Sequence, residues 1–172
     1  EENLTNIRAI VEAEKCEFNP HRVDQCLFDD VPVHSHFKKE NYYRLLISKY
    51  VDAPAALYLD ADIIVCGSIL TVFDVNFDGN ILAAVPEPFF AYRKKLGINE
   101  EASYFNSGVL YIDIDAWKRA AITQLAFTFI SEFPECISFA DQCVLNYVLE
   151  GRWSPLEPKF NVQTNMLKGE VR

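Results

Sequence analysis

The sequence has no apolar run long enough to cross a membrane, because none of its stretches approaches the eighteen or more residues of a transmembrane helix. Residues 1–5 lack both the basic start and the apolar run of a signal peptide. The five cysteines contain no C-x-x-C pair and are odd in number, so neither a zinc cage nor a disulfide framework is indicated. We therefore expect a protein of the reducing cytoplasm.

Basic residues are also few, since 16 Lys and Arg stand against 25 Asp and Glu, for a net charge of -9. Sequence-independent binding to a phosphate backbone needs clustered Lys and Arg, so nucleic acid is not an expected partner. The charge still permits one anionic ligand that is held by a local cation or a metal. With 50% apolar residues in 172, the chain is long enough for a single domain over residues 1–172.

Apolar patterns alternate between helical and strand-like spacing along the chain. The expected helices are 4–15, 39–50 and 141–149, one near 89–96 and others within 116–133; the expected strands are 55–59, 81–85 and 109–114. Alternating elements with nearly continuous apolar strands favour an α/β fold, with a mostly parallel sheet covered by helices on both faces. Such sheets place ligands at the carboxyl ends of their strands.

Asp60 and Asp62 follow the apolar strand Ala55 to Leu59 directly. If the backbone stays extended, residues two apart point to the same side, so both carboxylates converge. Hard carboxylate oxygens suit Mg²⁺ or Mn²⁺, and such ions usually take substrate phosphates as further ligands. Two aspartates at the end of a strand are equally good turn formers, so the pair alone leaves both interpretations open.

Four blocks in fixed order surround this pair, and together they resemble glycosyltransferase family 8, a family of retaining enzymes with a Rossmann-like GT-A fold. The blocks are Tyr42-Tyr43-Arg44-Leu45, Tyr58-Leu59-Asp60-Ala61-Asp62, Phe105-Asn106-Ser107-Gly108-Val109-Leu110 and Asp141-Gln142-Cys143-Val144-Leu145-Asn146, with Phe160-Asn161 and Thr164-Asn165 as a further segment. The likeness runs from about Val31 to Asn165. Among its members are bacterial lipopolysaccharide galactosyl- and glucosyltransferases.

The resemblance implies that Asp60 and Asp62 hold Mn²⁺ (or Mg²⁺) on the diphosphate of a UDP-hexose, with Ala61 against the ribose. Arg44 matches an arginine that contacts the donor, and its fork of N–H donors suits phosphate or sugar hydroxyls. A salt bridge on a helix surface is the alternative role for Arg44.

In the third block, Asn106, Ser107 and Gly108 match residues at the donor sugar. We expect a tight Asn-Ser-Gly turn there, in which the glycine lets backbone approach substrate closely, although such a turn also forms without any function.

In the fourth block, Asp141 and Gln142 match the family's catalytic pair beside the reactive carbon. Asp141 would attack that carbon or stabilise its positive charge, and Gln142 would position the donor. Capping of the helix up to Leu149 is the alternative for Asp141.

Two departures from the family pattern concern the ends of the chain. The family's opening strand, with nucleotide-base contacts, and its late histidine segment, with a third metal ligand, would lie outside residues 1–172, so we expect a catalytic domain truncated at both ends. Glu87 is only a loose candidate for a sugar contact. His34 and His36 match no ligand position and are expected to be solvated.

The resulting hypothesis is a hexosyltransferase that acts on a glycan, with the lipopolysaccharide core as acceptor and a peripheral contact with the inner membrane through the absent C-terminal region. The first alternative is an inactive or binding-only fragment of such an enzyme. The second is a phosphatase of the haloacid-dehalogenase type, whose strand also ends in D-x-D.

Overall fold

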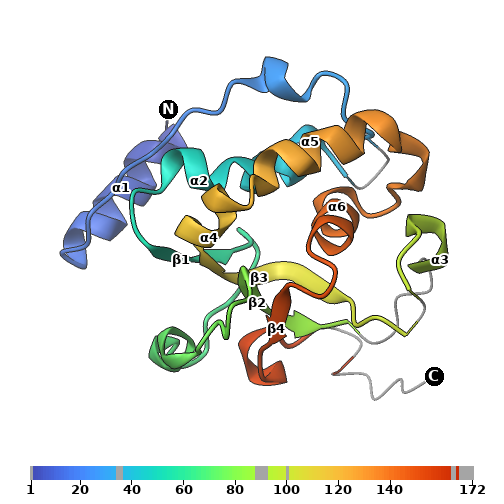
Figure 1. Cartoon of the computed structure of the whole chain (residues 1–172). Coiled ribbons are helices and arrows are strands. Elements are labelled where there is room, and N and C mark those ends of the chain that lie inside the picture. Colours follow the sequence, from blue (N-terminus) through green and yellow to red (C-terminus); the bar gives the residue numbers. More distant parts are fainter. Residues whose placement is uncertain (1, 34–36, 88–92, 100, 164–165, 167–172) are drawn as a thin grey trace.

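We describe the protein from a computed structural model over residues 2–33, 37–87, 93–99, 101–163 and 166. Six α-helices and four strands are assigned there: α1 (Glu2–Ala13), α2 (Ile47–Tyr50), β1 (Ala55–Leu59), β2 (Leu82–Pro86), α3 (Arg93–Leu96), β3 (Phe105–Asp113), α4 (Ile114–Arg119), α5 (Ile122–Glu132), α6 (Ala140–Val148) and β4 (Trp153–Pro155). Short 3₁₀ helices cover Gln25–Phe28, Lys39–Leu46, Leu70–Asp74, Pro134–Cys136 and Pro158–Phe160. The figures show the same chain from one side (Figure 1).

The four strands form one sheet in the order β1-β3-β2-β4. β3 is antiparallel to both β1 and β2, and only β2 and β4 pair in parallel. The expectation of a mostly parallel sheet is therefore wrong. β1, β2 and β4 do run in one direction, but β3 is inserted between β1 and β2 and runs against them. Apolar runs report burial and not strand direction, so the sequence pattern could not reveal this insertion.

The two faces of the sheet are covered unequally. On one face α4, α5, α6 and the 3₁₀ helix Lys39–Leu46 enclose the main core, which includes Tyr42, Leu110 and Trp117. On the other face a small cluster of Val72, Ala83, Val85, Tyr111 and Leu156 lies with the 3₁₀ helices Leu70–Asp74 and Pro158–Phe160 beside it. Among the described residues, the expected α-helices thus cover one face only, as the helices above the strands in Figure 1 show.

Most expected elements are confirmed, with shifted boundaries. The strand predicted at 55–59 is β1, the strand at 81–85 is β2 (Leu82–Pro86), and the helix at 141–149 is α6. The helical stretch at 39–50 is mainly 3₁₀ and becomes α-helical only at Ile47. Of the helix predicted near 89–96, α3 covers Arg93–Leu96, and residues 88–92 lie outside the described chain.

The strand predicted at 109–114 begins four residues earlier, so that Asn106, Ser107 and Gly108 lie within β3. The expected tight turn at these residues is wrong. Their stretch instead forms an irregularity: from Ala84 to Pro86, two residues along β2, the pairing on β3 moves five residues, from Leu110 to Phe105. β3 therefore continues past the end of β1, where it needs hydrogen-bond partners other than β1.

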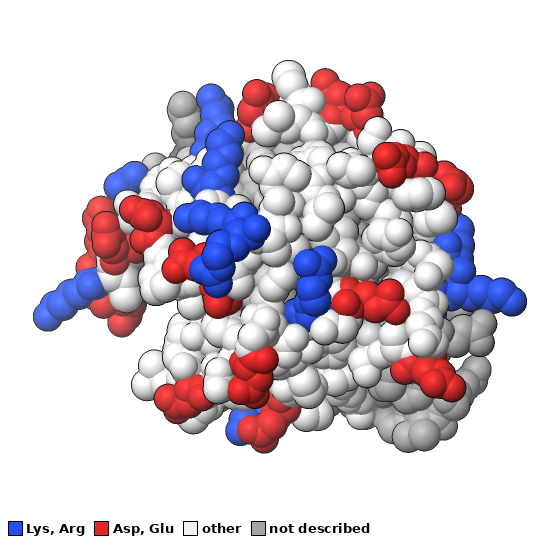
Figure 2. Space-filling view, viewed as in Figure 1, with Lys and Arg blue, Asp and Glu red and all other residues white. Residues whose placement is uncertain are grey.

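Charged side chains are scattered over the surface. Small acidic groups alternate with Lys and Arg and with broad uncharged areas on the face shown in Figure 2. Among the described residues, no helix is both long and apolar enough to span a bilayer.

Candidate active site

The chain turns immediately after β1, at the two aspartates. The backbone N–H of Asp60 donates to the carbonyl of Gly108 at 2.9 Å, and the N–H of Ile63 donates to the carbonyl of Asp60 at 3.1 Å. The chain closes a turn between Asp60 and Ile63, so the condition under which both carboxylates would point to the same side, an extended backbone through Asp62, is not met. Asp60 points into a polar network, whereas Asp62 and Ala61 are exposed. The two carboxylates thus have different surroundings.

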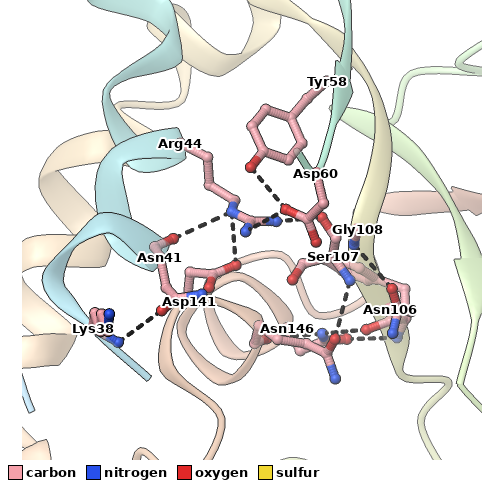
Figure 3. A network of polar contacts seen from close by, with 12 residues as sticks. Lys38, Asn41, Arg44, Tyr58, Asp60, Asn106, Ser107, Gly108, Asp141 and Asn146 are labelled. Atoms are coloured by element: carbon pink, nitrogen blue, oxygen red, sulfur yellow. Dashed lines mark hydrogen bonds and ion pairs between the residues drawn. The ribbon is translucent and has the colours of Figure 1, made fainter. Parts of the chain in front are cut away.

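Arg44 is the centre of that network (Figure 3). One guanidinium nitrogen, Nη2, donates to Oδ1 of Asp60 at 2.7 Å, and Nη1 donates to the carbonyl of Ser107 at 2.5 Å. Nε lies 3.0 Å from Oδ2 of Asp141. The Arg44 side chain is only 5% exposed, so the alternative of a surface salt bridge is wrong. A guanidinium directs its N–H donors in a fixed plane, so Arg44 holds these three partners in defined directions, whereas an ammonium group rotates freely.

Asp141 enters the network from the first turn of α6 and is buried. Burial raises the pKa of Asp141 to about 6, although the positive charge of Arg44 and a hydrogen bond from the Ser107 side chain both act to lower it. The N-cap of α6 is Phe139, so the helix-cap alternative for Asp141 is also wrong. A carboxylate with a raised pKa beside a cation is typical of functional sites.

Several backbone groups at the start of β3 form hydrogen bonds with side chains and not with a neighbouring strand. Phe105 exchanges two bonds with the amide of Asn146, at 2.8 and 2.9 Å. The N–H of Ser107 donates to Oε1 of Gln142 at 3.1 Å, and the N–H of Gly108 donates to Oδ1 of Asn106 at 2.9 Å. The predicted residues Asn106, Ser107 and Gln142 are therefore held in one hydrogen-bonded group.

Asn106 uses a single oxygen for two internal contacts. Its Oδ1 accepts from Gly108 and also from Nδ2 of Asn161 at 2.8 Å. Within the described residues its Nδ2 group makes no hydrogen bond that we observe. That group is consequently a donor that can serve a ligand.

Three side chains in the network were not predicted as site residues. The hydroxyl of Tyr58 donates to Oδ1 of Asp60 at 2.9 Å, and its ring lies under Arg44, with 4.5 Å from the guanidinium carbon to the ring centroid. Burial raises the pKa of Tyr58, so its hydroxyl remains a donor at neutral pH. Asn146 and Asn161 are the other two, and both are buried. Strand alternation places Tyr58 on the side of Asp60, a signal that could have identified it.

Asp62 lies on the rim of a separate groove of about 710 Å³. Its walls are mainly apolar and come from β1, β3, the loop after β1 and the 3₁₀ helices Leu70–Asp74 and Pro158–Phe160 with the residues that follow the latter. The apolar lining residues are Leu57, Leu59, Ile63, Ile64, Val65, Ile69, Val72, Val109, Phe160 and Val162. Asn161 also lines it and connects it to Asn106. The network and the groove therefore adjoin.

Among the described residues, no three His, Cys, Asp or Glu side chains gather closely enough to cage a metal ion. His34 and His36 lie outside the described residues. The backbone N–H of Glu87 donates to the carbonyl of Tyr104 at 2.7 Å, next to the pairing of β2 with β3. A single carboxylate can still contribute to an Mg²⁺ or Mn²⁺ site whose other ligands are mainly water and phosphate. Asp60 fits this role because Arg44 and Tyr58 bind its Oδ1 and leave Oδ2 for a cation.

Gly108 is a site where even one methyl group should be harmful. A Cβ there would lie 3.1 Å from both Oδ1 of Asn106 and Oδ2 of Asp60. Both oxygens belong to hydrogen-bonded groups that cannot move away freely. Alanine usually stabilises a protein relative to glycine because it reduces the conformational entropy of the unfolded chain, but here the clash should outweigh that gain. We expect Gly108→Ala to lower the free energy of unfolding by about 1–3 kcal/mol in a urea titration.

Gly67→Ala is the matched control for that measurement, because a Cβ there would meet nothing within 4 Å. Equal stability of the two variants would show that the approach of Gly108 to Asp60 is not tight.

Asp141→Asn should stabilise the protein at neutral pH. The raised pKa means that the folded state disfavours the charged form, so the stability of the wild type falls as pH rises from about 4 to about 6. Above about pH 6 the wild type carries the whole cost of a charged, buried Asp141, which is roughly 3 kcal/mol when the pKa shift is converted into free energy. Removing one member of a buried ion pair usually destabilises, but Arg44 keeps Asp60 as its partner. Thermal melting between pH 4 and pH 8 measures the difference.

The melting curves of wild type and Asp141→Asn should converge toward pH 4 and separate toward pH 7, with the variant higher. A variant that melts lower than the wild type at pH 7 would show that the ion pair with Arg44 outweighs the burial of Asp141.

Comparison with known proteins gives one consistent result. The model of "Glycosyl transferase family 8" matches residues 1–172. General stress protein A of Bacillus subtilis is 30% identical over 151 residues, which cover 84% of this chain and 53% of that protein. Lipopolysaccharide 1,3-galactosyltransferase of Salmonella typhimurium is 31% identical over 146 residues, 79% of this chain and 43% of that protein. The chain spans about half the length, or less, of the curated relatives it matches.

Among solved structures, the galactosyltransferase LgtC in complex with donor and acceptor sugar analogues is similar, with a TM-score of 0.74 and 26% identity over 80% of this chain and 51% of that chain. The glycosyltransferase GlyE of Streptococcus pneumoniae has a TM-score of 0.60 and 30% identity over 74% of this chain and 30% of that chain. The expected GT-A α/β fold is thereby confirmed, apart from the strand directions corrected above.

Proposed function

Because this chain belongs to glycosyl transferase family 8, we propose that it is the core of a retaining hexosyltransferase that moves a sugar from a UDP-hexose to a glycan. One observation carries the proposal. Arg44, Asp60, Ser107 and Asp141 come from four separate segments of the chain and meet in one buried network at the end of β1. The buried ion pair of Arg44 with Asp141 is weak evidence for a role in stability, so the network favours a functional role for these residues.

Asp60 and Asp62 are the proposed ligands of an Mn²⁺ or Mg²⁺ ion. When bound, such an ion would neutralise the negative charge that develops on a departing diphosphate. Arg44 supports this role by fixing Oδ1 of Asp60, so that the carboxylate is held in one orientation before any ligand arrives. Tyr58 fixes the same oxygen from the other side, at 2.9 Å.

Asn106, Ser107 and Gly108 form the proposed contact surface for the donor sugar. Arg44 and Gln142 bind the carbonyl and the N–H of Ser107, and the Asn106 side chain binds the N–H of Gly108, so these backbone groups are held before substrate binds. Preorganised groups of this kind reduce the cost of ordering a ligand. The Nδ2 group of Asn106 and the amide nitrogen of Gln142 are the donors we propose for sugar hydroxyls.

Asp141 is the proposed catalytic carboxylate. With its pKa at about 6, Asp141 is ionised at pH 7. An ionised carboxylate can attack the anomeric carbon as its bond to the diphosphate breaks, after which the acceptor hydroxyl displaces the carboxylate and gives up its proton. Alternatively it can stabilise an oxocarbenium ion while the leaving diphosphate takes the proton of the acceptor, which attacks from the same face. Both routes retain the anomeric configuration. In both, Arg44 limits the cost of keeping Asp141 charged in a buried place.

The proposed acceptor is a glycan, with the lipopolysaccharide core as the first candidate. Support comes from two relatives, a lipopolysaccharide 1,3-galactosyltransferase of Salmonella typhimurium and a lipopolysaccharide 1,2-glucosyltransferase of Escherichia coli. Such an acceptor would bring the protein to the cytoplasmic side of the inner membrane as a peripheral protein. Because the chain belongs to glycosyl transferase family 8, the phosphatase alternative has no support. The alternative hypothesis for residues 1–172 is an inactive or binding-only fragment of such an enzyme.

The experiment is a transfer assay on the full chain with UDP-galactose and UDP-glucose, with and without Mn²⁺, and with a panel of core oligosaccharides. We expect one of the two donors to give product, and only when the metal is present. The anomeric configuration of the transferred sugar, determined by NMR, should be retained. A chelator should abolish transfer and added Mn²⁺ should restore it. Inverted configuration, or release of phosphate from an aryl phosphate in place of sugar transfer, would contradict the proposal.

A further inference from the structure

β3 extends beyond the end of β1, so the backbone N–H and C=O of Phe105 have no partner on β1. The last pairing of β1 with β3 joins Leu59 to Val109, so β1 does not reach Phe105. On the other side Glu87 donates its N–H to the carbonyl of Tyr104. Because alternate residues of an antiparallel strand direct their N–H and C=O groups to opposite neighbours, those of Phe105 face away from β2, toward the missing continuation of β1.

Asn146 takes the place of that missing strand. Its Oδ1 accepts from the N–H of Phe105 at 2.8 Å, and its Nδ2 donates to the carbonyl of Phe105 at 2.9 Å. A side-chain amide has the donor and acceptor of a peptide group, so it can pair with a strand as backbone does. Asn146 is 2% exposed, and Phe105 is fully buried. Leaving these backbone groups unpaired would cost about 1–3 kcal/mol each.

The same amide also reaches the active-site side of α6. Nδ2 of Asn146 donates to the carbonyl of Gln142 at 2.9 Å, and Oε1 of Gln142 accepts from the N–H of Ser107 at 3.1 Å. A closed chain of hydrogen bonds therefore runs from Phe105 through Asn146 and Gln142 back to Ser107. It sets the distance between the start of β3 and the first turns of α6.

We propose that Asn146 is a positioning residue for the transfer reaction, which fixes Gln142 and the Asn106-Ser107 backbone relative to each other. The inference rests on the proposed function, since it concerns the residues assigned there to the donor sugar. Asn146 acts through these neighbours. Displacement of positioned groups by about 1 Å can reduce a rate by about a hundredfold.

The test uses Asn146→Asp in the full chain. The aspartate keeps an acceptor for the N–H of Phe105 but turns both amide donor contacts into contacts between a carboxylate and a carbonyl oxygen. We expect kcat per folded molecule to fall about 10- to 100-fold, with KM for UDP-hexose little changed. Asn146→Thr, which keeps one donor and one acceptor, should have a kcat between those of wild type and Asn146→Asp.

Asn80→Asp is the matched control. Asn80 is partly buried and donates through its side-chain amide to Oγ of Ser154 at 2.8 Å, away from the network. It should lose stability without losing kcat. A merely structural Asn146 would behave in the same way, so an unchanged kcat in folded Asn146→Asp and Asn146→Thr would overturn the inference.

Hydrogen exchange on the unaltered full chain separates this inference from the proposed function and requires no variant to fold. The amides of Phe105 and Ser107 should be protected to the level of central β3 amides such as that of Leu110. Exchange at the rate of exposed loops would overturn the inference even in an active enzyme. Protection of these amides in a protein without transferase activity would leave the hydrogen bonds of Asn146 and Gln142 to β3 intact and would contradict the proposed function instead.

Discussion

Replacing Asp60 by asparagine should lower the rate of sugar transfer by about 10²- to 10³-fold, the size of effect seen when one preorganised electrostatic contact is removed. Asparagine keeps an oxygen for the hydrogen bonds of Arg44 and Tyr58, which are 2.7 and 2.9 Å long in the wild type. It loses the charge that would hold a divalent cation. The fold should therefore survive while catalysis fails, and kcat for a UDP-hexose with saturating Mn²⁺ measures the loss.

Asp52→Asn is the control for the change in net charge, because Asp52 is exposed and lies eight residues before Asp60, ahead of β1. It should retain full activity. Undiminished transfer by Asp60→Asn at low Mn²⁺ concentration would remove Asp60 from the metal site and leave it a purely structural partner of Arg44.

Replacing Arg44 by alanine should have the largest effect on stability, a loss of about 3–5 kcal/mol in the free energy of unfolding, as for other broken buried ion pairs. Asp141 would be left buried without its cation, and the carbonyl of Ser107 would lose its donor. Activity should also be lost, because Asp60 would no longer be oriented. Urea unfolding of the full chain at pH 7 measures the first effect.

The cause of the Arg44→Ala loss can be tested with pH and with a second substitution. The penalty should shrink as pH falls toward about 6, because Arg44 lowers the pKa of Asp141, and without Arg44 the buried carboxyl takes up its proton at a higher pH than in the wild type. At pH 7 Asp141→Asn should raise the stability of Arg44→Ala by more than it raises that of the wild type, which is the sign of an uncompensated buried charge. Additive effects of the two substitutions at every pH would mean that Arg44 contributes through packing on Tyr58 and not through charge.

The sequence predicted elements better than their arrangement. Residues 55–59 and 141–149 were identified because their apolar spacing is set by local burial. The antiparallel β3 was missed because direction depends on which strands become neighbours, and the Asn106-Ser107-Gly108 stretch was taken for a turn because those residues favour turns locally. The pairing of that stretch is decided by contacts with α6 and with the end of β1, which no local pattern contains.

For the candidate site, the sequence likewise predicted which residues belong to it but not which groups they contact. The four motif blocks predicted Arg44, Asp60, Asn106, Asp141 and Gln142, and the structure brings these residues into one network. Their roles in catalysis stay predictions. What the sequence could not provide was the partner of each group: Arg44 reaches Ser107 across 63 residues, and Phe105 reaches Asn146 across 41.

The metal on the donor diphosphate is the central claim, and calorimetry of the full chain with Mn²⁺ and UDP tests it most directly. We predict that Mn²⁺ binds more tightly when UDP is present and UDP more tightly when Mn²⁺ is present, by the same factor, as linkage requires. Asp60→Asn should abolish this mutual effect. Equal UDP affinity with and without Mn²⁺ in the wild type, or an unchanged mutual effect in Asp60→Asn, would contradict the account.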